Sequence, residues 1–236
     1  MTLFLASVRN TDEAETALGA GADIIDLKDP GKGALGALDL NTISACVSYV
    51  DGRVPVSATV GDLPLQGTIV CDAVRAVASS GVNYVKLGLF PGGGARSCLS
   101  LLAEEARPVP LILVILADAL PDFDAVEATA SIGAHGVMLD TAGKSSGSLL
   151  DYLSVEALTD FVAAAKAEGL SVGLAGSLSA KQVPSLLSLQ PDVIGFRGAL
   201  CRGGARDAAL DPEACAVIRD LIPRCSESSI KPGLAA

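Results

Sequence analysis

Short hydrophobic runs recur along the chain about every 30 residues, and polar or glycine-containing stretches separate them. Most of the runs are rich in Val, Ile and Leu, and polar residues seldom interrupt them. Such runs are typical of strands that are buried on both faces, as in a parallel sheet. The pattern therefore predicts eight strands, at Leu3–Val8, Ile24–Lys28, Val54–Thr59, Tyr84–Leu89, Leu111–Leu116, Gly136–Thr141, Ser171–Gly176 and Val193–Gly198.

Between the runs, apolar residues return at the spacing of a helix face. Within Glu156–Ala167 they recur at intervals of three and four, which predicts an amphipathic helix. Asn10 is the predicted N-cap of a helix at Thr11–Leu18, and Ser179 with Gln182 forms a capping-box pattern. Glycines also follow several predicted helices as C-cap signals, namely Gly21, Gly81, Gly133 and Gly169.

Eight successive strand-then-helix units in 236 residues predict an α/β fold, a single (β/α)8 TIM barrel. We expect the barrel to span residues 1–225 and the Ser-, Gly- and Ala-rich residues 226–236 to form a flexible tail. The alternative fold is a doubly wound open sheet. A dinucleotide-binding sheet of that kind would carry GxGxxG after its first strand, and residues 7–10 contain no such motif.

Composition restricts the class of protein. Hydrophobic residues make up 50% of the chain, which excludes a disordered protein. The 17 Lys and Arg against 27 Asp and Glu give a formal charge of −10, which argues against a nucleic-acid partner. No segment has the roughly 20 apolar residues of a membrane span, and the N-terminus lacks a basic leader. Six scattered cysteines without a CxxC motif fit a reducing compartment, so we expect a cytoplasmic protein without a membrane partner.

Lysines and aspartates stand at the ends of predicted strands, where barrels of this kind carry their active sites. Asp26 and Lys28 share one strand face, and Lys86 interrupts a hydrophobic strand. Asp140 ends another strand, and Lys144 follows in its loop. One such lysine alone would favour a salt bridge, whereas Lys28 and Lys86 together favour catalysis. A lysine desolvated beside another cation can attack a carbonyl and form a Schiff base, while carboxylates transfer protons.

Glycine-rich turns follow the last two predicted strands, where this fold frequently binds phosphate through backbone amides. The candidate phosphate-binding residues are Gly176, Ser177, Arg197, Gly198, Arg202 and Gly203. For the glycine-rich loop at residues 91–94 three interpretations stay open. It is a second phosphate-binding loop, a mobile lid or a plain connector. His135 is the sole histidine and the cysteines lack ligand spacing, so we expect no metal and no cofactor.

Eight sequence blocks carry a resemblance to one family. They are Gly21–Ile25, Asp26–Pro30, Ser57–Asp62, Tyr84–Gly88, Met138–Thr141, Leu174–Ser177, Gly195–Gly198 and Cys201–Gly204. The chain resembles the (5-formylfuran-3-yl)methyl phosphate synthases, also called 4-(hydroxymethyl)-2-furancarboxaldehyde-phosphate synthases, of methanofuran biosynthesis. The resemblance runs nearly end to end. It departs at Lys32, where archaeal members are expected to have an acidic residue, and we expect that loop to affect substrate entry.

The resemblance implies a lyase of the class I aldolase type, which condenses two molecules of glyceraldehyde 3-phosphate with loss of water and one phosphate. It implies Lys28 as the Schiff-base lysine, Lys86 and Lys144 as further active-site lysines, and Asp26 and Asp140 as acid/base groups. Two alternatives stay open. One is another lysine aldolase of a sugar phosphate, which would release no inorganic phosphate, and the other is a barrel that binds phosphorylated metabolites without turnover. We also expect a homo-oligomer, because barrels with apolar outer helices commonly self-associate.

Overall fold

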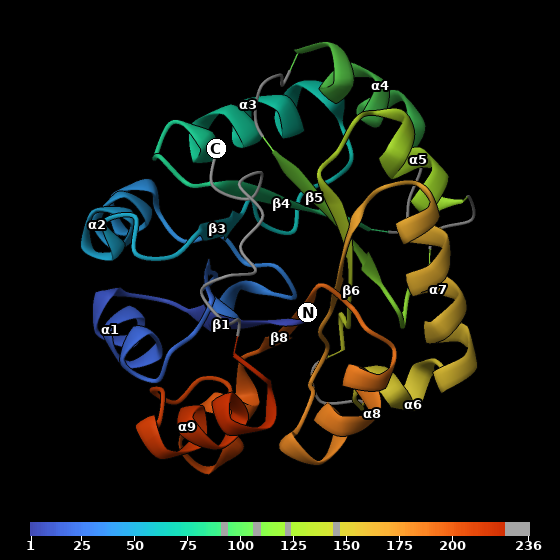
Figure 1. Cartoon of the computed structure of the whole chain (residues 1–236). Helices are drawn as coiled ribbons and strands as arrows, with labels where there is room; N and C mark the ends of the chain where they lie inside the picture. Colours follow the sequence, from blue (N-terminus) through green and yellow to red (C-terminus); the bar gives the residue numbers. More distant parts are fainter. Residues whose placement is uncertain (91–93, 106–109, 121–123, 144–146, 225–236) are drawn as a thin grey trace.

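The eight hydrophobic runs form eight parallel strands that close into one barrel, with β8 paired to β1 (Figure 1). The structure is a computed structural model, and it describes residues 1–90, 94–105, 110–120, 124–143 and 147–224. The strands are β1 (Leu3–Val8), β2 (Ile24–Leu27), β3 (Val56–Thr59), β4 (Tyr84–Leu89), β5 (Leu111–Leu116), β6 (Gly136–Asp140), β7 (Ser171–Leu174) and β8 (Val193–Phe196). Closure confirms the predicted TIM barrel and excludes the open doubly wound sheet.

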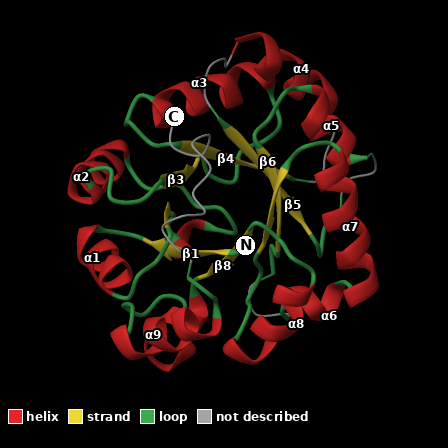
Figure 2. Ribbon diagram, viewed as in Figure 1, coloured by secondary structure: helices red, strands yellow, loops and turns green. Residues whose placement is uncertain are grey.

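Helices lie outside the strands and form the outer ring of the barrel (Figure 2). They are α1 (Thr11–Gly19), α2 (Leu40–Val50), α3 (Gly67–Ala78), α4 (Ala95–Glu105), α5 (Ala125–Ser131), α6 (Leu149–Tyr152), α7 (Val155–Ala167), α8 (Val183–Ser188) and α9 (Pro212–Leu221). Short 3-10 helices in the loops are η1 (Pro30–Lys32), η2 (Ala180–Gln182), η3 (Gly198–Leu200) and η4 (Arg202–Gly204). Across the described ranges, no helix is both long enough and apolar enough to span a bilayer.

The predicted helix ends are confirmed by local hydrogen bonds and dihedral angles. The side chain of Asn10 accepts a hydrogen bond from the backbone N–H of Glu13 (2.9 Å), which caps α1. The capping box of Ser179 and Gln182 is present at the start of η2, which leads into α8. The four predicted C-cap glycines all have positive φ, a conformation that glycine adopts at little cost, at Gly21, Gly81, Gly133 and Gly169.

Several strands are shorter than the hydrophobic runs predicted, by one or two residues. β3 begins after Pro55, which has no N–H for the ladder. β7 ends before Gly176, whose φ of +108° lies outside the strand region. β8 ends at Phe196, because Arg197 turns to φ −132° and ψ −69°. The glycine-rich turns therefore begin inside the predicted runs.

Hydrophobic side chains alternate between two layers along each strand. Outward-facing residues such as Phe4 and Ala6 pack against the helices. Inward-facing residues such as Leu5, Val114 and Met138 form a separate cluster inside the barrel. Glycine makes room for Met138, because a Cβ on Gly173 would lie 2.5 Å from its Cε. This packing fills the lower barrel and leaves polar side chains at the carboxyl ends of the strands.

Candidate active site

Asp26 is the centre of a buried hydrogen-bond network inside the barrel. Its Oδ1 accepts hydrogen bonds from Nζ of Lys86 (3.0 Å) and Oγ of Ser57 (2.7 Å), and its Oδ2 accepts one from Oγ of Ser7 (2.8 Å). Burial alone raises the pKa of Asp26, but the charges of Lys86 and Lys28 and the hydrogen bonds from the two hydroxyls together outweigh it. The pKa of Asp26 therefore lies below its usual value of 3.8. Asp26 is therefore a fixed anion at neutral pH.

Ser7 and Ser57 are site residues that the sequence reasoning did not assign. They lie on β1 and β3 as the register partners of Asp26 on β2. Both serines are buried, and both hydroxyls donate a hydrogen bond to the carboxylate of Asp26. The signal that could have found them is a serine facing the barrel interior at the level of Asp26 on each neighbouring strand.

Lys28 and Asp140 form a second buried ion pair, which crosses the mouth of the barrel. Lys28 follows the last residue of β2 and Asp140 ends β6, and Nζ lies 3.3 Å from Oδ2. The other carboxylate oxygen of Asp140 accepts the backbone N–H of Thr141 (2.7 Å), which fixes its orientation. Only 6% of Lys28 is exposed. The amine and the carboxylate are therefore close enough to exchange a proton away from bulk water.

A cavity of about 310 Å³ opens above these side chains. Lys28, Lys86 and Asp140 line its base. The loops after β7 and β8 supply most of its wall, through Ala175, Gly176, Ser177, Leu178, Ser179, Arg197, Gly198, Ala199, Gly204 and Arg206. The structure therefore brings Lys28, Lys86 and Asp140 together with the turns after β7 and β8, while Asp26 lies behind Lys86 and outside the lining.

Gly176 occupies a tight position between the loops after β6 and β7. A Cβ on this residue would lie 2.9 Å from Cγ2 and 3.1 Å from the backbone nitrogen of Thr141. Ser177 follows with φ +48°, a left-handed conformation that is uncommon for a residue with a side chain. The turn is therefore held in a special backbone geometry at the cavity wall.

Arg197 does not have the side-chain role that the sequence predicted. Its guanidinium forms a buried ion pair with Glu13 on α1. It also donates to the carbonyl oxygens of Ser7, Arg206 and Ala208. These contacts use all five of its N–H donors, so none remains for a phosphate group. The expectation for this side chain is corrected: it fastens the loop after β8 to the first strand and helix.

Arg206 contributes a cationic side chain to the cavity, and the sequence did not lead us to predict this residue. It lines the cavity, and among the described residues its guanidinium has one hydrogen bond, from Nη2 to the carbonyl of Gly33 (3.3 Å). Arg202 and Gly203 are exposed and do not belong to the lining. The local sequence around a basic residue in a long loop does not indicate whether its side chain faces the cavity or the solvent.

Some predicted features fall outside this arrangement. Lys144, residues 91–93 of the glycine-rich loop, and the tail at residues 226–236 lie outside the described residues. His135 precedes β6 at the opposite end from the cavity, with its ring 4.9 Å from that of Tyr84. Burial lowers the pKa of this histidine below its usual value. Among the side chains that the structure describes, no three His, Cys, Asp or Glu gather as metal ligands.

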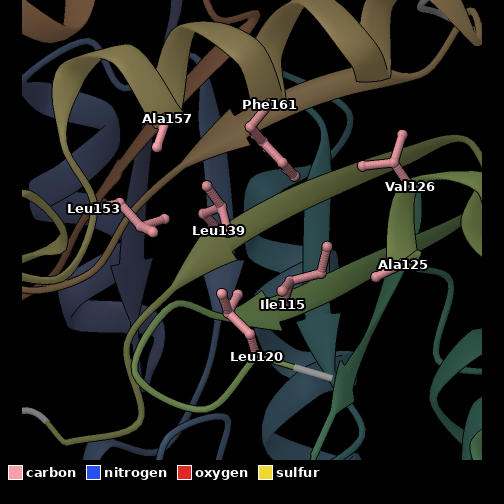
Figure 3. Close-up of a pocket in the computed structure, with 8 residues that line it drawn as sticks. All are labelled: Ile115, Leu120, Ala125, Val126, Leu139, Leu153, Ala157 and Phe161. Atoms are coloured by element: carbon pink, nitrogen blue, oxygen red, sulfur yellow. The ribbon is translucent and has the colours of Figure 1, made fainter. Parts of the chain in front are cut away.

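A second cavity of about 260 Å³ lies outside the barrel, between the strands and the helical layer. Figure 3 shows Ile115 of β5 and Leu139 of β6 on one side, and Ala157 and Phe161 of α7 on the other. All of its lining residues are aliphatic or aromatic. It therefore offers no acid, base or nucleophile, and the chemistry belongs to the cavity at the barrel mouth.

Comparison with known proteins places this site in a family. Residues 4–219 match the sequence profile of the 4-HFC-P synthases. The (5-formylfuran-3-yl)methyl phosphate synthase of Methanocaldococcus jannaschii is 36% identical over 233 residues, which cover 93% of this chain and 99% of that one. A protein of Methylorubrum extorquens, provisionally given the same name, is 44% identical over 209 residues, or 88% of this chain and 86% of that one.

Among solved structures, phosphoribosyl anthranilate isomerase from Thermus thermophilus has a TM-score of 0.64 at 14% identity. The match covers 94% of this chain and 98% of that one, and it shows the shared barrel fold. The family rests instead on the sequence matches, which span the site and nearly the whole barrel. The chain belongs to the 4-HFC-P synthase family.

Proposed function

We propose that this protein is a (5-formylfuran-3-yl)methyl phosphate synthase of methanofuran biosynthesis, which condenses two molecules of glyceraldehyde 3-phosphate through an imine on Lys28. The observation that carries the proposal is the buried pair of Lys28 and Asp140 at the mouth of a barrel of this family. The relatives named above bear the name of this activity. A lysine that faces a cavity and touches a carboxylate has the surroundings that imine chemistry requires.

The first steps follow from the position of the amine. Lys28 transfers a proton to Asp140, and its free Nζ attacks the carbonyl carbon of one triose phosphate. The carbinolamine then accepts a proton at its hydroxyl, loses water and becomes the imine. Loss of a proton from the neighbouring carbon gives an enamine, whose carbon attacks the carbonyl of the second triose. Asp140, 3.3 Å from Nζ, is the nearest carboxylate for these proton transfers.

Asp26 and Lys86 are suited to an electrostatic role beneath the reacting atoms. Asp26 has a lowered pKa and accepts three hydrogen bonds, so it is a poor proton acceptor at neutral pH. Its charge instead orients Nζ of Lys86 towards the cavity. We therefore assign proton transfer mainly to Asp140 and give Lys86 the binding or isomerisation of one triose.

A phosphate group fits the side of the cavity that the loops after β7 and β8 form. The backbone of Gly176, Ser177 and Gly198 lines this side, and Arg206 brings a guanidinium to it. The second phosphate is the one that leaves. Two trioses contain the atoms of the furan product, one inorganic phosphate and two molecules of water, so the overall conversion needs no oxidant or reductant.

The test is to trap the imine with sodium cyanoborohydride in the presence of glyceraldehyde 3-phosphate. Intact-protein mass spectrometry and peptide mapping would locate the reduced adduct. We expect one triose-phosphate adduct on Lys28, and we expect the untreated enzyme to release inorganic phosphate from glyceraldehyde 3-phosphate alone. Lys28→Arg keeps the positive charge but removes a usable amine, so it should form no adduct at that position.

Other outcomes would redirect the proposal. An adduct on Lys86 or Lys144 would keep the imine mechanism and reassign the nucleophile. An adduct on Lys28 without phosphate release would favour an ordinary sugar-phosphate aldolase. Binding of glyceraldehyde 3-phosphate without any adduct or product would contradict the imine mechanism.

A further inference from the structure

Asp118, in the loop after β5, binds the backbone of the loop that follows Asp140 on the neighbouring strand. β5 and β6 are parallel neighbours, and Leu116 at the end of β5 is the register partner of Asp140 (Figure 1). Oδ1 of Asp118 accepts the backbone N–H of Ala142 (2.7 Å), and its Oδ2 accepts that of Gly143 (2.6 Å). A side chain of one loop therefore fixes the backbone of the next.

Three successive backbone N–H groups in the loop after β6 donate to carboxylates. The first, of Thr141, donates to Oδ1 of Asp140 (2.7 Å), and the next two donate to Asp118. Successive amides that converge in this way form a concave surface that binds anions. Carboxylates of the protein itself occupy this surface, so charge-assisted hydrogen bonds hold the turn.

The side chain of Thr141 adds no hydrogen bond to this turn among the described residues. Thr141 is fully buried, and its Oγ1 has no hydrogen-bond partner in the described parts of the chain. On the strand side, the backbone N–H of Ala117 donates to the carbonyl oxygen of Asp140 (2.8 Å). The direction in which the chain leaves Asp140 therefore depends on the two hydrogen bonds to Asp118.

The rotation of the Asp140 carboxylate matters because its two oxygens have different partners. Oδ1 accepts the N–H of Thr141, and Oδ2 lies 3.3 Å from Nζ of Lys28. Proton transfer needs heavy atoms about 2.6–3.2 Å apart, so even a small rotation that lengthens this contact slows it. When Asp118 is lost, the amide of Thr141 is free to turn, and Oδ1 loses the contact that sets the rotation.

Asp118 does not belong to the described lining of the cavity. Its side chain is half-buried behind the loop after β6. The wall proposed to bind phosphate consists of the loops after β7 and β8. Substrate binding and proton transfer therefore depend on different loops, which allows an experiment to separate them.

We propose that Asp118 is a positioning residue, which holds the carboxylate of Asp140 against Nζ of Lys28 and thereby sets the rate of imine formation. This inference rests on the proposed imine chemistry of Lys28. Asp118 acts through the backbone of the loop after β6, and Asp140 remains the group that exchanges the proton. Loss of Asp118 therefore slows the reaction without weakening the binding of glyceraldehyde 3-phosphate.

The experiment follows the reduced adduct on wild-type protein and on Asp118→Ala by intact mass, with sodium cyanoborohydride in excess. Initial rates over a range of glyceraldehyde 3-phosphate concentrations give the maximal rate and the concentration for half of it. We expect the maximal rate of Asp118→Ala to fall about tenfold or more, because misplacement of a reacting group by about 1 Å can cost 10²-fold. The half-saturating concentration should stay at the wild-type value.

Asp124→Ala is the matched control. Asp124 belongs to the same connection between β5 and β6, and it also accepts two backbone N–H groups, from Val126 and Glu127 (both 3.0 Å). It caps α5 and does not bind the loop after β6. This substitution removes the same number of hydrogen bonds, so we expect it to leave the maximal rate and the half-saturating concentration unchanged.

Added formate provides a second readout. Asp118→Ala leaves the amides of Ala142 and Gly143 without their anion, and formate carries the same carboxylate group in a small molecule. We expect formate, compared with chloride at equal ionic strength, to restore part of the maximal rate in Asp118→Ala. Wild-type protein and Asp124→Ala should not respond. A rate that falls in Asp118→Ala and does not recover in formate would count against positioning through these amides.

Asp118→Asn keeps the test valid if Asp118→Ala fails to fold. Asparagine has the same shape but one acceptor oxygen in place of two, so it keeps only part of the contact, and its maximal rate should also fall. If the folded variants keep the wild-type maximal rate, or change only the half-saturating concentration, the inference is wrong while the imine proposal stands. If wild-type protein forms no adduct, the imine proposal fails and the inference fails with it.

Discussion

At the scale of single residues, the most consequential group is Asp26, which is buried with three hydrogen-bond donors around it. Asp26→Asn keeps the shape of the side chain but removes the charge that compensates Lys86. Removal of one partner from a buried ion pair costs about 3–5 kcal/mol, because the other charge stays buried. We expect a loss of that size in the free energy of unfolding at pH 7, measured by urea denaturation.

The double variant with Asp26→Asn and Lys86→Met is the control. It removes both charges, so we expect it to be more stable than Asp26→Asn alone. If the double variant is the less stable of the two, the stranded charge is not the cause of the loss.

The pH dependence of this difference follows from the lowered pKa of Asp26. Burial raises this pKa, but the charges of Lys86 and Lys28 together with the hydrogen bonds from Ser57 and Ser7 lower it by more, so its value in the folded protein lies below that in the unfolded chain. The carboxylate therefore contributes its full stability above the unfolded pKa of 3.8 and loses it as the pH falls through the folded pKa. The gap between wild type and Asp26→Asn should be constant near neutral pH and shrink in acid.

At the scale of elements, local sequence predicts strands and caps well, because their causes lie within a few residues. The N-cap at Asn10 and the positive-φ glycines after the helices follow from local backbone preferences. The position of Arg206 does not follow in this way. It lies in a loop without periodicity, and its guanidinium contacts the carbonyl of Gly33, 173 positions away in the sequence.

A substitution at Gly176 tests how closely the loops after β6 and β7 must approach each other. Gly176→Ala adds a Cβ at 2.9–3.1 Å from Thr141, besides the strain of a positive φ. We expect a loss of about 1–3 kcal/mol in stability and a KM for glyceraldehyde 3-phosphate that rises about tenfold or more. Both can be measured on the same preparation, by urea denaturation and by phosphate release.

Gly169→Ala is the matched control for that substitution. Gly169 also has a positive φ, of +75°, but a Cβ there would meet nothing within 4 Å. It should lose about 1–2 kcal/mol from backbone strain and keep the wild-type KM. An equal rise of KM in both variants would show that the contact with Thr141 has no special effect on the site.

At the scale of the whole molecule, the described cysteine side chains are buried in the packing of the barrel and its helices. The five cysteines in the described part of the chain are all buried and unpaired. Burial raises the pKa of Cys46, Cys98 and Cys215 to about 11, so almost no reactive thiolate is present at pH 7. We expect Cys225→Ser protein to react with Ellman's reagent only as fast as it unfolds, and to release five equivalents in urea.

Cys225 lies outside the described residues, so the wild-type protein serves as the comparison. A sixth thiol that reacts at once in wild type and is absent from the variant would belong to Cys225. Rapid labelling of the variant without denaturant would contradict the burial of the other five. The expected homo-oligomer stays a prediction, and light scattering of the same samples would test it.

The overall fold could be predicted from the sequence because the same unit repeats eight times, and each repeat adds evidence for the next. That Lys28, Lys86, Asp26 and Asp140 lie close together could also be predicted, because the fold sends the carboxyl ends of all strands to one rim. Their catalytic roles stay a proposal. The contacts of the Arg197 side chain could not be predicted. Its partner Glu13 is 184 positions away, and no local pattern states that a basic residue beside a glycine-rich turn faces a helix rather than a ligand.

The ion pair of Arg197 and Glu13 joins the last strand to the first helix, and Arg219 of α9 binds Asp23 before β2 in the same way. These ion pairs join segments that are synthesised early and late in the making of the barrel. Until β8 has been synthesised, β1 and β7 both present open edges that can pair with another chain. A growing chain that already contains most of its core is therefore an incomplete sheet with two open edges, the kind of species in which aggregation competes with folding.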